Sequence, residues 1–221
     1  MPRVLCFGDS NTHGSPPVEV RGHYARFDAA TRWPTRMAAA LGSGWELAEE
    51  GLPGRTAAFP DPVGMGDHMD GRIGLRIALQ SHGPLDWLVL MLGTNDVKAR
   101  FGATPSRIAA GLAGLVDLAL GVEMAARHPA LHVLLVCPPP VERRGVLAGE
   151  FLGGPAKSAA LAPLVAGLAR ERGCRFLDAG QVLSVSPVDG VHFTAEGHAA
   201  LARAVAGVLG ADGVSPGGAV R

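Results

Sequence analysis

Short apolar runs alternate along the chain with longer segments of helical periodicity. The apolar runs predict strands at 4–7, 45–48, 86–92, 132–137 and 175–177, and the periodic segments predict helices over 32–41, 70–81, 105–127, 156–172 and 195–209. The first, third and fourth runs are almost continuously apolar, which is typical of strands covered on both faces. The alternation predicts an α/β fold, namely a three-layer α/β/α sandwich with a flavodoxin-like central parallel sheet of about five strands.

Signals at helix ends set the boundaries of this pattern. Thr104 followed by Pro105 is typical of an N-cap and a first helical position, and Thr194 with Glu196 predicts the start of the last helix. Gly210 is expected to end that helix, and the following Gly-, Ala- and Pro-rich residues are expected to be disordered. Residues 1–209 are therefore predicted to form one domain and residues 210–221 a tail.

Charge and cysteine content narrow the class of protein. Lys plus Arg and Asp plus Glu both number 20, and this balance argues against a protein that binds nucleic acid or membranes through bulk positive charge. Cys6, Cys137 and Cys174 lie in or beside apolar runs without a CxxC pair, which predicts buried thiols rather than a metal or redox site. No secretory leader precedes the first strand, and the longest apolar run is far too short to span a bilayer. A cytoplasmic location is expected.

Unusual residues follow three of the predicted strands and precede the last helix. The segments are Gly8-Asp9-Ser10-Asn11, Gly51-Leu52-Pro53-Gly54-Arg55, Gly93-Thr94-Asn95-Asp96 and Asp189-Gly190-Val191-His192. In an open parallel sheet, ligands bind beyond the carboxyl ends of the strands. The four segments are therefore expected to meet at one edge.

These residue types suit acyl transfer through a serine. A serine hydroxyl needs an adjacent base, and the three-residue spacing lets one loop present His192 as that base with Asp189 as its acceptor. The oxyanion needs donors that are in place before it forms, and the candidates are the N–H groups of Ser10 and Gly54 and the side-chain amide of Asn95.

The four segments resemble the blocks that define the SGNH (GDSL-type) hydrolase superfamily. The resemblance covers about residues 3 to 209. Further segments are similar to the arylesterase/acyltransferase branch of this superfamily, namely Arg32-Trp33-Pro34, Glu49-Glu50-Gly51-Leu52, Met91-Leu92-Gly93-Thr94-Asn95-Asp96, Pro138-Pro139-Pro140 and Asp189-Gly190-Val191-His192-Phe193-Thr194. The resemblance implies that Ser10 is the nucleophile, His192 the base and Asp189 its orienting partner. It also implies an oxyanion hole made by Ser10, Gly54 and Asn95.

Two segments depart from the branch. Asn11-Thr12-His13 stands where branch members often have leucine after the serine and tryptophan after the threonine, and residues 141–155 diverge as well. Asn11 and His13 are accordingly candidates for contact with the substrate. Arg55, which follows Gly54, is a further candidate, although it is equally consistent with a structural ion pair.

Several acidic residues and two other protein classes allow alternative interpretations of the sequence. Asp96 suits a helix N-cap, and the cluster Asp61, Asp67, His68 and Asp70 lies among prolines and glycines that favour a solvated loop over a metal site. An α/β-hydrolase is rejected because the serine lies at position 10 and lacks the Gly-x-Ser-x-Gly context. A binding module that has lost catalysis remains an alternative, and a comparison with a serine-to-alanine variant separates it from an enzyme.

The resemblance implies a serine esterase that hydrolyses short-chain, acetyl-type esters of aryl or small alcohols through an acyl-enzyme. The alternatives are an acyltransferase or perhydrolase that uses an alcohol or a peroxide, and a carbohydrate O-deacetylase. No cofactor or metal is expected, and the partner is a small-molecule ester. A homo-oligomer is expected from an apolar loop set thought to be exposed: Phe59, Met65, Met69, Phe151 and Leu152.

Overall fold

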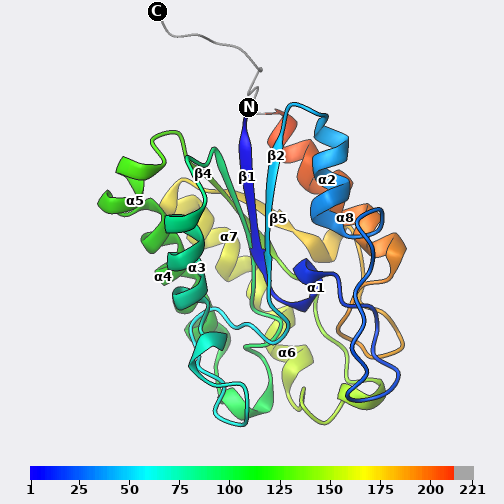
Figure 1. The fold of residues 1–221 in the computed structure, drawn as a ribbon. Coiled ribbons are helices and arrows are strands. Elements are labelled where there is room, and N and C mark those ends of the chain that lie inside the picture. The colour runs from blue at the N-terminus through cyan, green and yellow to red at the C-terminus, as the bar shows by residue number, and fades with distance from the viewer. Residues whose placement is uncertain (212–221) are drawn as a thin grey trace, which may run out of the picture.

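A five-stranded parallel sheet forms the centre of the molecule. The computed structural model describes residues 1–211 of the 221-residue chain. The strands are β1 (Arg3–Gly8), β2 (Glu46–Gly51), β3 (Trp87–Met91), β4 (His132–Cys137) and β5 (Arg175–Asp178), and their order across the sheet is β2-β1-β3-β4-β5 (Figure 1). This order is that of flavodoxin-like folds. The predicted α/β class and parallel sheet are confirmed.

Helices cover both faces of the sheet and make the three-layer sandwich. Helices α2 and α8 pack together over one face, and α3, α4 and α7 cover the other (Figure 1). The helices are α1 (Ser10–His13), α2 (Trp33–Leu41), α3 (Gly71–Ser81), α4 (Pro105–Leu120), α5 (Val122–Arg127), α6 (Gly154–Ala159), α7 (Leu161–Arg172) and α8 (Ala195–Ala211).

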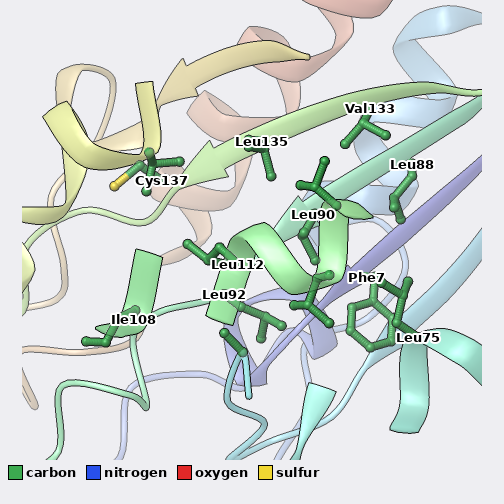
Figure 2. Close-up of a cluster of buried hydrophobic side chains, with 14 of the residues drawn as sticks. Phe7, Leu75, Leu88, Leu90, Leu92, Ile108, Leu112, Val133, Leu135 and Cys137 are labelled. Carbon is green, nitrogen blue, oxygen red and sulfur yellow. The ribbon is translucent and has the colours of Figure 1, made fainter. Parts of the chain in front are cut away.

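The side chains of each strand alternate between two cores. In β1, Leu5 and Phe7 join the core under α3, α4 and α7, whereas Val4 and Cys6 join the core under α2 and α8. Figure 2 shows the first core, in which Phe7 lies beside Leu75 of α3. Each fully buried side chain of this kind stabilises the fold by about 1.5–3 kcal/mol. Burial on both faces explains the continuous apolar runs in the sequence.

The topology fixes where a ligand can bind. The chain leaves β1 toward β2 on one side and leaves β3 toward β4 on the other, although β1 and β3 are neighbours. The loops at the carboxyl ends of these two strands therefore separate, which opens a crevice at this point of the sheet. Ser10 follows β1 and Asn95 follows β3, so both border this crevice.

The helix boundaries differ from the predicted ones at three places. The predicted helix 105–127 is broken at Gly121, which has extended backbone and caps α5. The predicted helix 156–172 is two helices, because Pro163 lies in the first turn of α7 and has no N–H to continue α6. Gly210 lies within α8, which continues to Ala211, so the expected end at Gly210 is wrong. The rest of the predicted tail, 212–221, lies outside the described residues.

Two further predictions concern the state of the three cysteines and the presence of a membrane-spanning helix. Cys6, Cys137 and Cys174 are all free, and the first two are buried. No helix within residues 1–211 combines the length and the apolar character needed to cross a membrane.

Candidate active site

Ser10, His192 and Asp189 lie in one hydrogen-bonded row at the carboxyl edge of the sheet. Ser10 begins α1 directly after β1, and its Oγ lies 3.1 Å from His192 Nε2. His192 Nδ1 lies 2.6 Å from Asp189 Oδ2. The side chains of Ser10 and His192 are almost fully buried, at 6% and 7% exposure. The structure thus brings Ser10 next to two residues that lie about 180 positions away in the sequence.

The surroundings of Asp189 keep this carboxyl ionised. Its Oδ1 accepts the N–H groups of Val191 and His192 at 2.9 and 3.0 Å, and its Oδ2 accepts the N–H of Val18 at 2.7 Å. Burial opposes ionisation, but the hydrogen bond and charge of His192 and the backbone donors outweigh it and lower the pKa of Asp189 to about 2. An ionised carboxylate accepts the Nδ1 proton of His192, which leaves the Nε2 lone pair facing Ser10.

Two of the predicted oxyanion donors, both backbone N–H groups, have no acceptor in the described part of the chain. Within residues 1–211, neither the N–H of Ser10 nor that of Gly54 donates to another protein group. Gly54 has φ +91°, a conformation that favours glycine. A Cβ at this position would also meet the sulfur atoms of Met65 and Met69 at 3.0 and 3.2 Å. Gly54, like Ser10, lines the cavity described below.

The side-chain amide of Asn95, the third predicted oxyanion donor, already has partners. Its Nδ2 donates to Arg55 O at 3.0 Å and to Asp9 Oδ2 at 3.3 Å. Asn95 also lines the cavity described below, so it is near the reacting atoms. Donation to a substrate oxygen would require the longer bond, to Asp9, to be given up. Burial raises the pKa of Asp9 to about 6.

A cavity of about 650 Å³ lies against Ser10 and His192. This volume is in the range that takes a small organic molecule. One wall is the segment 15–25, which has no regular secondary structure, and the opposite wall includes Lys98, Leu147, Glu150 and Phe151. Glu150 pairs with Lys98 at 3.2 Å and with Arg21 at 2.9 Å, so charged groups join the two walls. The sequence does not predict the wall formed by the segment 15–25, because this segment carries neither periodicity nor a motif.

Arg55 does not reach the cavity, so its predicted contact with the substrate is wrong. The side chain is 5% exposed and turns under the sheet edge, where it lies 4.0 Å from the centre of the Phe7 ring. Its guanidinium donates to Gly8 O at 3.0 Å and to Glu50 O. Arg55 thus ties the segment that carries Gly54 to the ends of β1 and β2. The role that fits this placement is structural, but it rests on carbonyl groups and an aromatic ring rather than on the ion pair that the sequence suggested.

Asn11 and His13 do not line the cavity either. The Asn11 side chain is buried against the backbone on both sides of His192. His13 Nε2 lies 2.9 Å from the hydroxyl of Tyr24, and it is Tyr24 that lines the cavity. The predicted contacts of Asn11 and His13 with the substrate are therefore corrected to contacts with the loops that form the site.

Asp96 is a buried carboxyl and not the N-cap that the sequence suggested. It begins no helix; its Oδ1 accepts the N–H of Ala57 at 2.8 Å, and its Oδ2 has no hydrogen-bond partner within residues 1–211. Burial raises the pKa of Asp96 to about 7, and the charges of Asp9 and Asp70 add to this effect. Folding therefore makes this carboxyl harder to ionise near neutral pH.

We expect Asp96→Asn to stabilise the fold more at pH 8 than at pH 5, relative to the natural chain. A folded-state pKa raised from 3.8 to about 7 means that stability present below pH 4 is lost as the pH rises through 7. Asparagine does not titrate, so the difference in free energy of unfolding should grow by roughly 2–3 kcal/mol between the two pH values. Urea unfolding at both pH values measures it. An equal difference at both would contradict the buried, titrating carboxyl, and Asp117→Asn on the surface of α4 is the control.

Two groups of loop residues singled out in the sequence, the acidic cluster and the apolar loop set, lie outside the row formed by Ser10, His192 and Asp189. Asp61 pairs with Arg100 at 2.7 Å and Asp70 with Arg72, and no group of three metal-ligating side chains is found among residues 1–211. Of the apolar loop set, Phe59, Met69 and Phe151 are buried, and only Met65 and Leu152 are exposed. The exposed apolar surface on which the expectation of an oligomer rested is thus smaller than predicted.

Comparisons with known proteins agree on one family. The model of the GDSL-like lipase/acylhydrolase family matches residues 6–200. A carbohydrate acetylesterase from Sinorhizobium meliloti is 39% identical and superposes with a TM-score of 0.91, over 96% of this chain and 99% of that one. An inhibitor-bound M. smegmatis aryl esterase is 38% identical, with a TM-score of 0.90 and the same coverage of both chains. A search of curated proteins finds no match.

Proposed function

Because the chain belongs to the GDSL-like lipase/acylhydrolase family, we propose that it is a serine esterase that cleaves short-chain, acetyl-type esters of aryl or small alcohols. One observation carries the proposal. The Ser10 hydroxyl, the His192 imidazole and the ionised Asp189 carboxylate form a continuous hydrogen-bonded row that faces a cavity of about 650 Å³. The substrate is a small-molecule ester, and the chemistry uses side chains and backbone N–H groups of this chain.

Acylation begins with proton transfer from Ser10 Oγ to His192 Nε2 as the oxygen attacks the ester carbonyl. The imidazolium that forms is stabilised by Asp189, which stays ionised. The negative charge on the carbonyl oxygen is met by the N–H groups of Ser10 and Gly54, with Asn95 as a third donor. His192 then gives its proton to the departing alcohol oxygen, the ester C–O bond breaks, and an acyl-enzyme remains.

Deacylation repeats these steps with water. His192 Nε2 takes a proton from water as its oxygen attacks the acyl carbonyl, and the same proton returns to Ser10 Oγ when the acid leaves. Free serine and the carboxylic acid are the products. An alcohol or a peroxide in place of water would give a new ester or a peracid.

Two observations bear on the class of ester. The cavity wall near Ser10 is largely apolar, with Pro16, Pro17 and Val191, which suits an acyl group or an aromatic alcohol. The charged residues Arg21, Glu150 and Lys98, which join the two walls, offer donors and acceptors that suit a hydroxylated alcohol such as a sugar. The similarity to both an aryl esterase and a carbohydrate acetylesterase supports these two classes equally. A carbohydrate O-deacetylase is therefore the second candidate.

Product analysis in the presence of an alcohol tests hydrolysis against transfer. We expect the chain to release mainly acetic acid from p-nitrophenyl acetate in buffer that contains 1-propanol, with propyl acetate as a minor product. Water is in large molar excess over the alcohol in such a buffer, so hydrolysis should dominate. The near-complete burial of Ser10 and His192, which limits access of water, is the observation that would favour transfer. If the fraction of propyl acetate among the products were well above the mole fraction of the alcohol, the protein would be an acyltransferase rather than an esterase. Parallel assays with acetylated sugars compare the two ester classes through kcat/KM.

Two further expectations complete the proposal. Three free thiols support a reducing, cytoplasmic location, and fractionation of the native source tests it. Met65, which lines the cavity, and Leu152 are both exposed, so a homo-oligomer that covers them is proposed. Light scattering at micromolar concentration checks this, and a monomer would contradict it.

A further inference from the structure

The side chain of Asn11 holds the backbone on both sides of His192. Asn11 Nδ2 donates to Val191 O at 3.1 Å, and Asn11 Oδ1 accepts the N–H of Phe193 at 3.2 Å. Val191 and Phe193 are the two neighbours of His192 in the chain. The Asn11 side chain is 1% exposed, so these bonds are made away from solvent.

The two bonds require both ends of an amide. A carbonyl oxygen lies at one end and an N–H group at the other, so the side chain must offer a donor to Val191 and an acceptor to Phe193. The reversed amide would place donor against donor and acceptor against acceptor. An ionised aspartate lacks the donor, and a leucine of the same branching lacks both groups. A buried N–H or C=O left without a partner costs about 1–3 kcal/mol, so the residue type at this position matters.

Asn11 also lies in the segment that carries the serine. It directly follows Ser10 in α1, and its own N–H is fixed by Asp9 Oδ1 at 2.9 Å. The other bonds to the backbone of His192 come from its own loop: its N–H donates to Asp189 and its C=O accepts the N–H of Ser186. Those bonds shape the loop but do not set its distance from Ser10. The Asn11 amide joins the serine segment directly to the histidine backbone.

We propose that Asn11 is a positioning residue that sets the 3.1 Å contact between Ser10 Oγ and His192 Nε2. The proposal rests on the proposed function in that this contact is the proton-transfer step of the esterase. Without the amide, the direct hydrogen bonds between the serine segment and the backbone beside His192 are lost, and only bonds from other segments, such as those of Val18 to Asp189 and of Glu142 to Gly190, still hold the histidine loop. A displacement of about 1 Å between reacting groups lowers a rate by about 100-fold.

The test compares Asn11→Leu and Asn11→Ala with Thr12→Val and Thr12→Ala. Thr12 is the next residue of α1 and is equally buried, but its hydroxyl has no hydrogen-bond partner within residues 1–211. The Thr12 variants therefore alter the same buried segment without removing a bond to the histidine loop. Steady-state kinetics with p-nitrophenyl acetate gives kcat and KM, and NMR hydrogen exchange follows the amide of Phe193 in each folded variant.

For both Asn11 variants we expect kcat to fall about 10- to 100-fold while KM changes less than about threefold. The Phe193 amide should exchange faster in them, because its acceptor is lost, while that of His192, held by Asp189, keeps its protection. The Thr12 variants should match the natural chain in both measurements.

Three results would overturn the positioning role. The first is a kcat for the Asn11 variants within about threefold of the natural chain, even with faster exchange at Phe193. The second is an equal loss of kcat in the Thr12 variants, and the third is an unchanged exchange rate at Phe193. A natural chain that cleaves no ester would contradict the proposed function instead, and the exchange measurement would still report on the Asn11 bonds.

Discussion

Ser10→Ala is expected to lower kcat/KM for p-nitrophenyl acetate by about 10⁴- to 10⁶-fold, because the substitution removes the attacking oxygen that His192 activates. The variant should fold normally. Within residues 1–211, Ser10 Oγ bonds only to His192 Nε2, and His192 lines the cavity, where water can take the place of the lost hydroxyl. Initial rates at several substrate concentrations, together with the thermal unfolding midpoint, measure both effects.

The matched control for this substitution is Ser106→Ala. Ser106 is an exposed serine near the start of α4, on a different element from the site. It should keep the activity of the natural chain within a factor of about two. If Ser10→Ala retained more than a tenth of the natural rate, the nucleophile would lie elsewhere and the binding-module reading would be the one to pursue.

Asp189→Asn is expected to lower kcat by about 10³- to 10⁴-fold. The amide that replaces the carboxylate no longer stabilises the imidazolium, and its NH₂ group can face Nδ1 and place the imidazole proton on Nε2. His192 would then have no lone pair toward Ser10. Because the residue at 189 also accepts N–H groups from Val18, Val191 and His192, a proton NMR spectrum should establish that the loop keeps its fold.

Asp117→Asn serves as the control for the loss of a carboxylate. Asp117 forms an exposed ion pair with Arg172 at 2.7 Å on the helical face of the molecule, away from the cavity. Its removal should leave kcat unchanged, since exposed pairs contribute little. A kcat for Asp189→Asn above about a tenth of the natural value would mean that His192 needs no orienting carboxylate.

The strand ends could be predicted from the sequence because the residues of each strand themselves determine where it lies. Continuous apolar runs mark strands buried on both faces, and the residues that follow such runs must lie at one edge of a parallel sheet. This rule placed Ser10, Asn95 and Gly54 at the same edge. The short spacing between Asp189 and His192 likewise allowed one loop to present both side chains.

The direction in which a side chain points after a turn depends on contacts with other parts of the chain, so it could not be predicted from the local sequence. Arg55 follows Gly54, but whether it points to the cavity or under the sheet depends on Phe7 and on the carbonyl groups of Gly8 and Glu50, which lie at the ends of β1 and β2. Asn11 was expected to face the substrate for the same reason, and its true partners lie 180 residues away. The segment 15–25 has no periodicity that could predict its path over the cavity.

The most direct test of the esterase mechanism is to trap the acyl-enzyme. The natural chain and Ser10→Ala are mixed with excess p-nitrophenyl acetate, quenched in acid during turnover, digested and analysed by mass spectrometry. The mechanism predicts one acetyl group on the peptide that contains Ser10 and no corresponding acetyl peptide from the variant. An acetyl group on another residue during undiminished turnover, or turnover without any acetyl-enzyme, would contradict it.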